Sequence, residues 1–253
     1  MATVKDILQF IESIAPVELK MEWDNVGLLC GRSDKEVRAV LVALDPFPHV
    51  CDEAAEIDAD LLVTHHPLIF EPLKAVTEQT TVGQSIMKLI AKDIAAINAH
   101  TNLDCAVGGV NDTLAQRLEL TEVSVIGNGH LLRAGQFDSS LSAFLEHVKA
   151  KLGCEGLRYV DGGKPVHRVA VGGGSCGSEL QAVIDAGCDT FVTADVKYNQ
   201  FWDAKTFGVN LIDAGHFQTE NPVCTVLAEK LQTAFPEIKV ILSKNHTDCM
   251  KFY

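Results

Sequence analysis

The chain has 253 residues, of which 47% are hydrophobic and 22% are charged, enough for one large domain or two modest ones with proper cores. Its formal charge is −13, from 34 acidic and 21 basic residues, which argues against non-specific binding to the phosphate backbone of nucleic acids. No apolar run approaches the roughly 20 residues of a membrane span, and the opening MATVKDILQF lacks a signal-peptide pattern. We therefore expect a cytoplasmic protein that binds neither membranes nor nucleic acid.

Segments with helical spacing alternate with short apolar runs typical of buried strands. We predict helices at 4–14, 49–57, 82–92, 110–118, 140–152, 180–186, 198–205 and 222–234. We predict strands at 26–29, 39–44, 59–64, 94–98, 131–137, 168–171, 190–193, 209–212 and 238–242. This alternation indicates α/β layering with largely parallel strands. Gly and Asn cluster at 122–129, so we place a provisional boundary there, between an amino-terminal half 1–125 and a carboxy-terminal half 126–253.

Three of the predicted strands are followed by side chains that commonly bind metal ions. Because ligands bind at the carboxyl ends of strands in open α/β sheets, these side chains are expected to share a site. Imidazole and carboxylate groups together suit zinc, iron(II), manganese or cobalt. The sequence therefore favours a metal site, against the alternative of ordinary hydrogen-bonded histidines, with these candidate ligands: His65, His66, Asp104, His216 and Glu220.

The spacing of these residues suggests two ions rather than one. Adjacent residues on a strand point to opposite faces, so His65 and His66 are expected to serve two neighbouring ions. Asp104 or Glu220 could bridge such a pair. His216 and Glu220 would share a face if a helix begins there. Five ligands over two ions leave positions for water, which is typical of a catalytic site.

A glycine-rich turn, Gly172 to Gly177, follows a predicted strand and satisfies the pattern GxGxxG. With Asp195 further on, it has the outline of a dinucleotide fingerprint. A nicotinamide oxidoreductase is therefore an alternative, although a complete nucleotide domain does not fit behind this mid-chain position. A simple tight turn is the plainer interpretation, and its backbone amides could also face a phosphate or another anion.

Two further features have structural interpretations. The eight cysteines form no CxxC pair, so free buried thiols are expected, including Cys105 beside Asp104. The motif Trp23-Asp24-Asn25 is typical of a turn with a packed tryptophan.

Taken together, six motifs resemble the Ngg-one-interacting-factor-three family, whose members are often labelled GTP cyclohydrolase I type 2-like. They are WDNVGLLCG at 23–31, THHPLIF at 64–70, NAHTNLD at 98–104, VGGGSCG at 171–177, TADVKY at 193–198 and DAGHFQTE at 213–220. The resemblance implies two interlinked α/β domains with three layers, mixed sheets and a dinuclear metal site in the cleft between them. It also implies the ligands His65, His66, Asp104, His216 and Glu220, two divalent ions per subunit, no other cofactor, and a homohexamer.

The resemblance further implies a metal-dependent hydrolase acting on a small molecule, with opening of the imidazole ring of GTP and release of formate as the expected reaction. Two alternatives stay open: a non-catalytic metal-binding protein with a regulatory or metal-delivery role, and a phosphoester or nucleotide hydrolase. One position departs from the family pattern, because Asn199 stands where a histidine often follows Lys197-Tyr198. Asparagine can hydrogen-bond but does not titrate near neutral pH.

Overall fold

The computed structural model describes residues 1–253, the side chain of Asn128 excepted. The fold is a mixed α/β fold with two mixed sheets, one in each of two compact units. The first unit comprises Met1–Ala106 and Cys224–Thr247, and the second comprises Val107–Val223 and Asp248–Tyr253. Among the described helices, none combines the length and the apolar character that crossing a bilayer requires.

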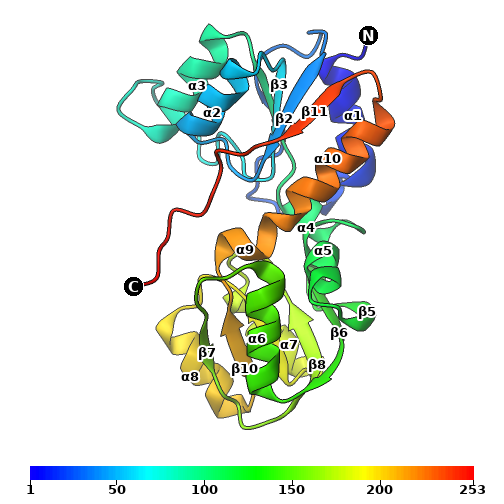
Figure 1. The fold of residues 1–253 in the computed structure, drawn as a ribbon, viewed down its shortest axis with the longest axis vertical. Coiled ribbons are helices and arrows are strands. Elements are labelled where there is room, and N and C mark those ends of the chain that lie inside the picture. The colour runs from blue at the N-terminus through cyan, green and yellow to red at the C-terminus, as the bar shows by residue number, and fades with distance from the viewer. The chain divides into compact units, whose positions relative to one another are not determined.

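The first unit is built on a five-stranded sheet with the order β1-β4-β3-β2-β11. Its strands are β1 (Gly27–Cys30), β2 (Ala39–Ala43), β3 (Leu61–Thr64), β4 (Ala95–Asn98) and β11 (Lys239–Leu242). Only β1 runs antiparallel to its neighbour. Its helices are α1 (Val4–Ile14), η1 (Val17–Leu19), α2 (Pro48–Glu56), α3 (Thr81–Ala91), α4 (Thr101–Cys105) and most of α10 (Pro222–Ala234). Figure 1 shows α2 and α3 on one face of this sheet and α1 and α10 on the other.

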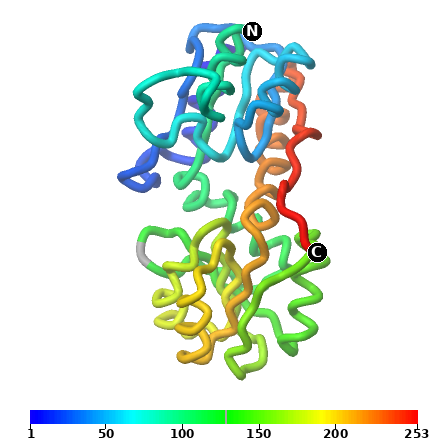
Figure 2. The backbone as a smooth tube through the Cα atoms, turned by 90° about the vertical axis from the view of Figure 1, so that its left-hand side faces the viewer, coloured from blue at the N-terminus to red at the C-terminus, as the bar shows by residue number. Residues whose placement is uncertain are grey.

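Apolar residues explain why this sheet is covered on both faces. In β2 and β3, Leu41, Ala43 and Leu62 join one buried cluster with residues of α2 and α3. Helix α1 buries Val4, Ile7 and Ile11 at helical spacing, and a capping box between Thr3 and Asp6 fixes its start. β11 adds the last strand by pairing in parallel with β2, so the orange and red segment in Figure 2 lies against the amino-terminal strands.

The second unit is built on a six-stranded sheet with the order β5-β6-β8-β9-β10-β7. Its strands are β5 (Thr121–Ile126), β6 (Leu132–Ser139), β7 (Arg158–Val160), β8 (Val166–Val171), β9 (Thr190–Thr193) and β10 (Asn210–Asp213). Its helices are α5 (Val110–Arg117), η2 (Asn128–His130), α6 (Leu141–Leu152), η3 (Gly177–Glu179), α7 (Leu180–Asp185), α8 (Tyr198–Phe207) and α9 (His216–Glu220). β8, β9 and β10 are parallel, and the outer strands are antiparallel.

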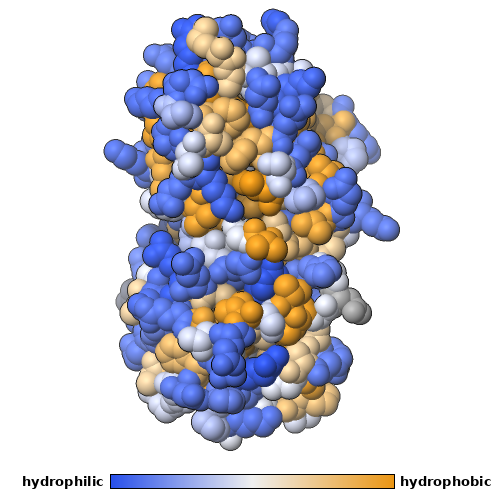
Figure 3. Space-filling view, turned by 90° about the vertical axis from the view of Figure 1, so that its right-hand side faces the viewer, coloured by the Kyte–Doolittle hydropathy of each residue, from blue (hydrophilic) through white to orange (hydrophobic). Residues whose placement is uncertain are grey.

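Alternation along the parallel strands separates two apolar cores in this unit. Val192 of β9 packs in a cluster with Phe144 of α6, whereas its neighbour Phe191 packs in a second cluster with Val183 of α7 and Ala204 of α8. Successive side chains point to opposite faces, so each strand supplies both cores. The sheet is therefore covered by helices on both sides. Hydrophilic residues predominate on the face drawn in Figure 3, with smaller hydrophobic groups among them.

The predicted helices and strands are all present, with ends that differ by a few residues. The segment 122–129, where we placed the provisional boundary, was not predicted to contain a strand, but residues 121–126 form β5, which pairs with β6. This strand is almost wholly exposed and so lacks the apolar run that reveals a buried strand. The three-residue β7 and the five-residue α4 were not predicted either, since both are too short for a periodic signal.

Candidate metal centre

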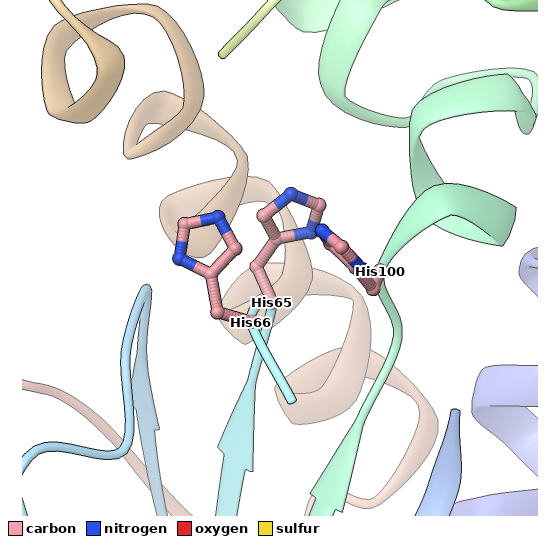
Figure 4. A group of neighbouring side chains, drawn as sticks. All are labelled: His65, His66 and His100. Atoms are coloured by element: carbon pink, nitrogen blue, oxygen red, sulfur yellow. The ribbon is translucent and has the colours of Figure 1, made fainter. Parts of the chain in front are cut away.

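The carboxyl ends of β3 and β4 bring three histidines together in the first unit. His65 and His66 follow β3, and His100 follows β4, directly before α4. Figure 4 shows the three imidazole rings gathered at these strand ends. Each ring offers a nitrogen that lies within 4.8 Å of the others, a spacing that could hold a metal ion. Of these three, His100 was not among the predicted ligands.

His65 and His66 do not point to opposite faces as the sequence suggested, because their ring centroids are only 4.9 Å apart. The reason is that β3 ends at Thr64, whose hydroxyl donates to the carbonyl oxygen of His66 at 2.7 Å. The chain therefore turns before His66, and the alternation of a strand no longer applies. Two neighbouring imidazoles at one strand end can serve one ion or two.

His65 and Asp104 form the most deeply buried pair of this group. The Nε2 atom of His65 lies 3.5 Å from Oδ1 of Asp104, and the side chains are 0% and 11% exposed. On its other side, Nδ1 of His65 lies 2.9 Å from the carbonyl oxygen of Ala99. A carbonyl only accepts, so Nδ1 carries the proton and Nε2 presents a lone pair in the neutral ring. A lone pair facing a carboxylate requires a cation or a proton nearby.

A carboxylate orients His66 in the same way. Nδ1 of His66 donates to Oδ1 of Asp45 at 2.7 Å, which again directs Nε2 outward. The parallel register explains the contact. Ala43 of β2 pairs with Thr64 of β3, and Asp45 and His66 each lie two positions after these paired residues. Burial raises the pKa of Asp45, but hydrogen bonds from His246 and His66 outweigh it and hold the pKa well below its usual value.

The Trp23-Asp24-Asn25 motif holds His100. Oδ1 of Asp24 accepts from Nδ1 of His100 at 2.8 Å, and Oδ2 accepts from the backbone and hydroxyl of Thr101 at 3.0 and 2.5 Å. Asp24 therefore orients the ring and also caps the first turn of α4, which carries Asp104. Burial raises the pKa of Asp24, but these hydrogen bonds and the His100 charge lower it further, to well below its usual value.

In the second unit, His216 and Glu220 lie together on the short helix α9, as predicted from their spacing. Nε2 of His216 lies 2.9 Å from Oε2 of Glu220. Nδ1 of His216 lies 2.7 Å from Oδ2 of Asp195, which follows β9 just as His216 follows the adjacent parallel strand β10. The carboxylate–imidazole pairing of the first unit is thus repeated here. Asp195 orients a candidate ligand, a role different from the ribose contact that a dinucleotide fingerprint would need.

The glycine-rich turn packs against this pair. A Cβ atom on Gly174 would overlap Oε1 of Glu220 and lie 3.0 Å from Nε2 of His216. Gly174 is therefore explained by its close approach to two candidate ligands. Two amides of the turn bond to protein side chains and not to an anion: Gly173 donates to Oδ1 of Asn111 at 2.7 Å, and Gly174 donates to Oγ1 of Thr219 at 3.0 Å.

Comparison with known proteins agrees with these motifs. The family model described as Duf34/NIF3 (NGG1p interacting factor 3) matches residues 2–249. The chain belongs to this family. It is 33% identical to a "GTP cyclohydrolase 1 type 2 homolog" of Clostridium acetobutylicum, with 98% of each chain covered. A homologue of the same name from Clostridium perfringens is 34% identical, covering 98% of this chain and 99% of that one.

A solved structure of the same family has the same fold. The Bacillus cereus protein related to NIF3 superposes with a TM-score of 0.93 at 27% identity, covering 100% of this chain and 99% of that one. Mixed sheets in two units are therefore a shared property of this Duf34/NIF3 chain and its solved relative.

Several polar residues around the histidines escaped sequence analysis. Asp45, Asp24 and Asp195 each hold the Nδ1 atom of a histidine, and His246 in turn contacts Asp45. A usable signal existed for two of them, since Asp24 and Asp195 lie inside motifs of the Duf34/NIF3 family. Of the eight cysteines, six are buried, Cys30 is half-buried and Cys249 is exposed, and none forms a disulfide.

Proposed function

We propose that the chain is a metal-dependent hydrolase that holds two divalent ions, with zinc, iron(II) and manganese(II) as candidates. The proposed ligands are His65, His66, Asp104, His216 and Glu220. One observation carries the proposal: in each unit an imidazole Nε2 atom faces a carboxylate oxygen, at 3.5 Å for His65 and Asp104 and at 2.9 Å for His216 and Glu220.

The donor set fits such ions. Neutral imidazole and carboxylate are the groups that these metals accept, and oxygen atoms behind each ring fix the nitrogen that is presented. Gly174 leaves room for the Glu220 carboxylate, where any side chain would displace it. When bound, two such ions supply a Lewis acid and a water molecule that is acidic enough to attack at neutral pH.

The names of the relatives favour a nucleotide substrate and the hydrolytic opening of the imidazole ring of GTP with release of formate. An exposed aromatic pair in the first unit supports a planar ring in this role. Trp23 and Phe70 are 61% and 49% exposed, and their centroids lie 5.6 Å apart. Each also contacts the ring of His100 edge-on, at 6.1 and 6.2 Å. A purine stacked on these rings would lie beside the histidine cluster.

A metal-binding protein without turnover is the second candidate, and Asn199 is the observation that favours it. Asn199 lies exposed on α8 and lines a cavity of about 280 Å³ with Gln200 and Asp203. If the histidine that often stands here handles a proton, asparagine cannot replace it in that step. Phosphoester hydrolysis is the nearest enzymatic alternative for the same ions and residues.

Metal content and GTP turnover test the proposal together. We expect wild-type protein purified without chelator to carry about two ions per chain, and His216→Ala/Glu220→Ala to lose most of them. His167→Ala is the matched control, because His167 pairs with Asp138 on the exposed surface of the second unit. Equal metal content in wild type and the double variant after reconstitution would refute the centre.

The reaction is tested on the metal-loaded protein. Formate released from GTP by wild type, and lost in Asp104→Ala, supports the hydrolase. Formate release unaffected by Asp104→Ala contradicts it. Two bound ions without turnover of GTP or phosphoesters would favour the non-catalytic candidate.

We further propose a homohexamer, on the strength of the family resemblance. Light scattering on the purified protein should give the mass of six chains, and the mass of one or two chains would contradict this.

A further inference from the structure

A short carboxy-terminal segment, Ser243–Thr247, lies against α2 and against the loop after β2 that carries Asp45. It follows β11 and is attached through Glu53 of α2, a carboxylate that is 7% exposed. Glu53 accepts hydrogen bonds from the hydroxyl of Ser243 and from the backbone of Lys244 and Asn245, the latter two at 2.9 and 3.2 Å. The segment is therefore held in place before it reaches His246.

His246 completes a chain of three side chains that ends at a proposed ligand. Its Nε2 atom lies 2.8 Å from Oδ2 of Asp45, and Oδ1 of Asp45 lies 2.7 Å from Nδ1 of His66. The side chain of His246 is only 5% exposed. Rings of Phe47 and His49 pack against it, with centroids at 5.9 and 5.8 Å. Both oxygens of one carboxylate are thus occupied by imidazoles.

The register of the sheet produces this arrangement. β2 lies between β3 and β11 and runs parallel to both, with Val42 opposite both Val63 and Leu242. The three loops beyond these strands therefore leave the sheet at the same edge, and each supplies one of the three side chains.

We propose that Asp45 and His246 are positioning residues for the metal centre, and that the carboxy-terminal segment thereby fixes the orientation of the His66 ring. The inference rests on the proposed metal site. With both oxygens bound, the Asp45 carboxylate cannot rotate, so Oδ1 stays in the plane that directs Nε2 of His66. Without His246, one oxygen loses its partner and the carboxylate gains rotational freedom, which loosens His66.

A purely structural role is the competing explanation, in which the bond from His246 to Asp45 only fastens the segment. Ser243→Ala separates the two explanations, because it removes the bonds that the Ser243 hydroxyl makes to Glu53 and to the backbone N–H of His246, while the side-chain contact of His246 with Asp45 remains. His246→Gln is the conservative variant, since its amide can still donate to Asp45. His66→Ala serves as the reference, because the metal position that it loses is the one to which His66 contributes.

The experiment is a Co²⁺ titration of the metal-free full-length chain, followed by visible absorption. Asp45→Ala should weaken the position lost in His66→Ala by about 10- to 100-fold and alter its spectrum, as outer partners of metal-bound histidines typically do. His246→Ala should weaken the same position by about 2- to 10-fold, a smaller loss than for Asp45→Ala because His246 acts on the ion only through Asp45 and His66. His246→Gln should recover most of this loss, and Ser243→Ala should stay within about twofold of wild type.

Two results would overturn the inference while leaving the metal centre intact. They are a His246→Ala protein with the affinity and spectrum of wild type, and a Ser243→Ala protein that changes as much as His246→Ala. Wild-type protein that binds no Co²⁺ would refute the metal centre itself, and this inference with it.

Discussion

Gly174→Ala offers a sharp test of whether the glycine-rich turn serves the metal site. Gly174 has a φ of +60°, where an L-residue is strained, and an added Cβ would overlap the Glu220 carboxylate. The backbone cost alone is roughly 1–2 kcal/mol, offset in part by the smaller freedom of alanine in the unfolded chain, about 0.4–1 kcal/mol. The overlap adds a second effect, because Glu220 must leave its position beside His216.

Gly153→Ala separates the two effects. Gly153 ends α6 with a φ of +70°, and no atom lies within 4 Å of the Cβ that would be added. We expect Gly153→Ala to lose about 1 kcal/mol of unfolding free energy, seen as a drop of about 2–4 °C in melting temperature, with full metal content. Gly174→Ala should melt lower still and lose metal affinity by more than the roughly 10- to 100-fold typical of outer partners.

The assay is metal analysis after dialysis, together with thermal unfolding in the presence of chelator. Chelator removes the contribution of bound metal to the melting temperature, so the unfolding data report the chain alone. If Gly174→Ala keeps two ions at wild-type affinity, the turn is not shaped by Glu220 and the reasoning fails.

Three further predictions concern other groups. Asp24→Asn should lower the free energy of unfolding by about 1–3 kcal/mol at pH 7. Because the pKa of Asp24 in the folded chain lies below the ordinary 3.8, the difference between wild type and variant should shrink as the pH falls below about 4. The chain has two tryptophans, so in a Trp202→Phe background GTP should quench Trp23 alone, and Trp23→Ala should weaken GTP binding by about 1–3 kcal/mol in calorimetry. Burial raises the pKa of Cys154 to about 11, so its thiol should react slowly at pH 8. Alkylation at pH 8 followed by mass spectrometry should find the exposed Cys249 modified in the native protein, and Cys154 modified only after unfolding. Early modification of Cys154, unquenched Trp23 or a pH-independent effect of Asp24→Asn would each contradict the corresponding argument.

Local pattern was enough to predict most of the helices and strands. β2, β3 and β9 are short apolar runs because both faces of their sheets are covered, and such runs are visible in any sequence. β5 pairs at an edge and buries almost nothing, so its residues carry no such signal. The sequence also identifies candidate metal ligands, since His65 directly follows β3 and His216 and Glu220 lie one helical turn apart on α9.

Asp45 and His246, which lie behind His66, were beyond sequence analysis, because their contacts depend on which strands are neighbours. Asp45 lies 21 residues before His66, and His246 lies 201 residues after Asp45, yet all three meet where parallel strands end. Nothing within 239–242 shows that this strand joins β2 rather than any other edge. The interpretation of His65 and His66 as pointing to opposite faces was wrong for a similar reason. The hydrogen bond from Thr64 to His66 turns the chain at the end of β3, and hydrophobic periodicity in the sequence does not reveal such a contact.

The pairing of β11 with β2 also bears on how the chain folds during synthesis. Residues 107–223 of the second unit are continuous and emerge from the ribosome before β11 does. Until then one edge of the apolar strand β2 has no neighbour, and such an open edge can pair with another nascent chain. The second unit is therefore free to fold co-translationally, whereas the first must wait for residues 224–247 to complete its sheet, and that interval is when a chaperone would be most useful.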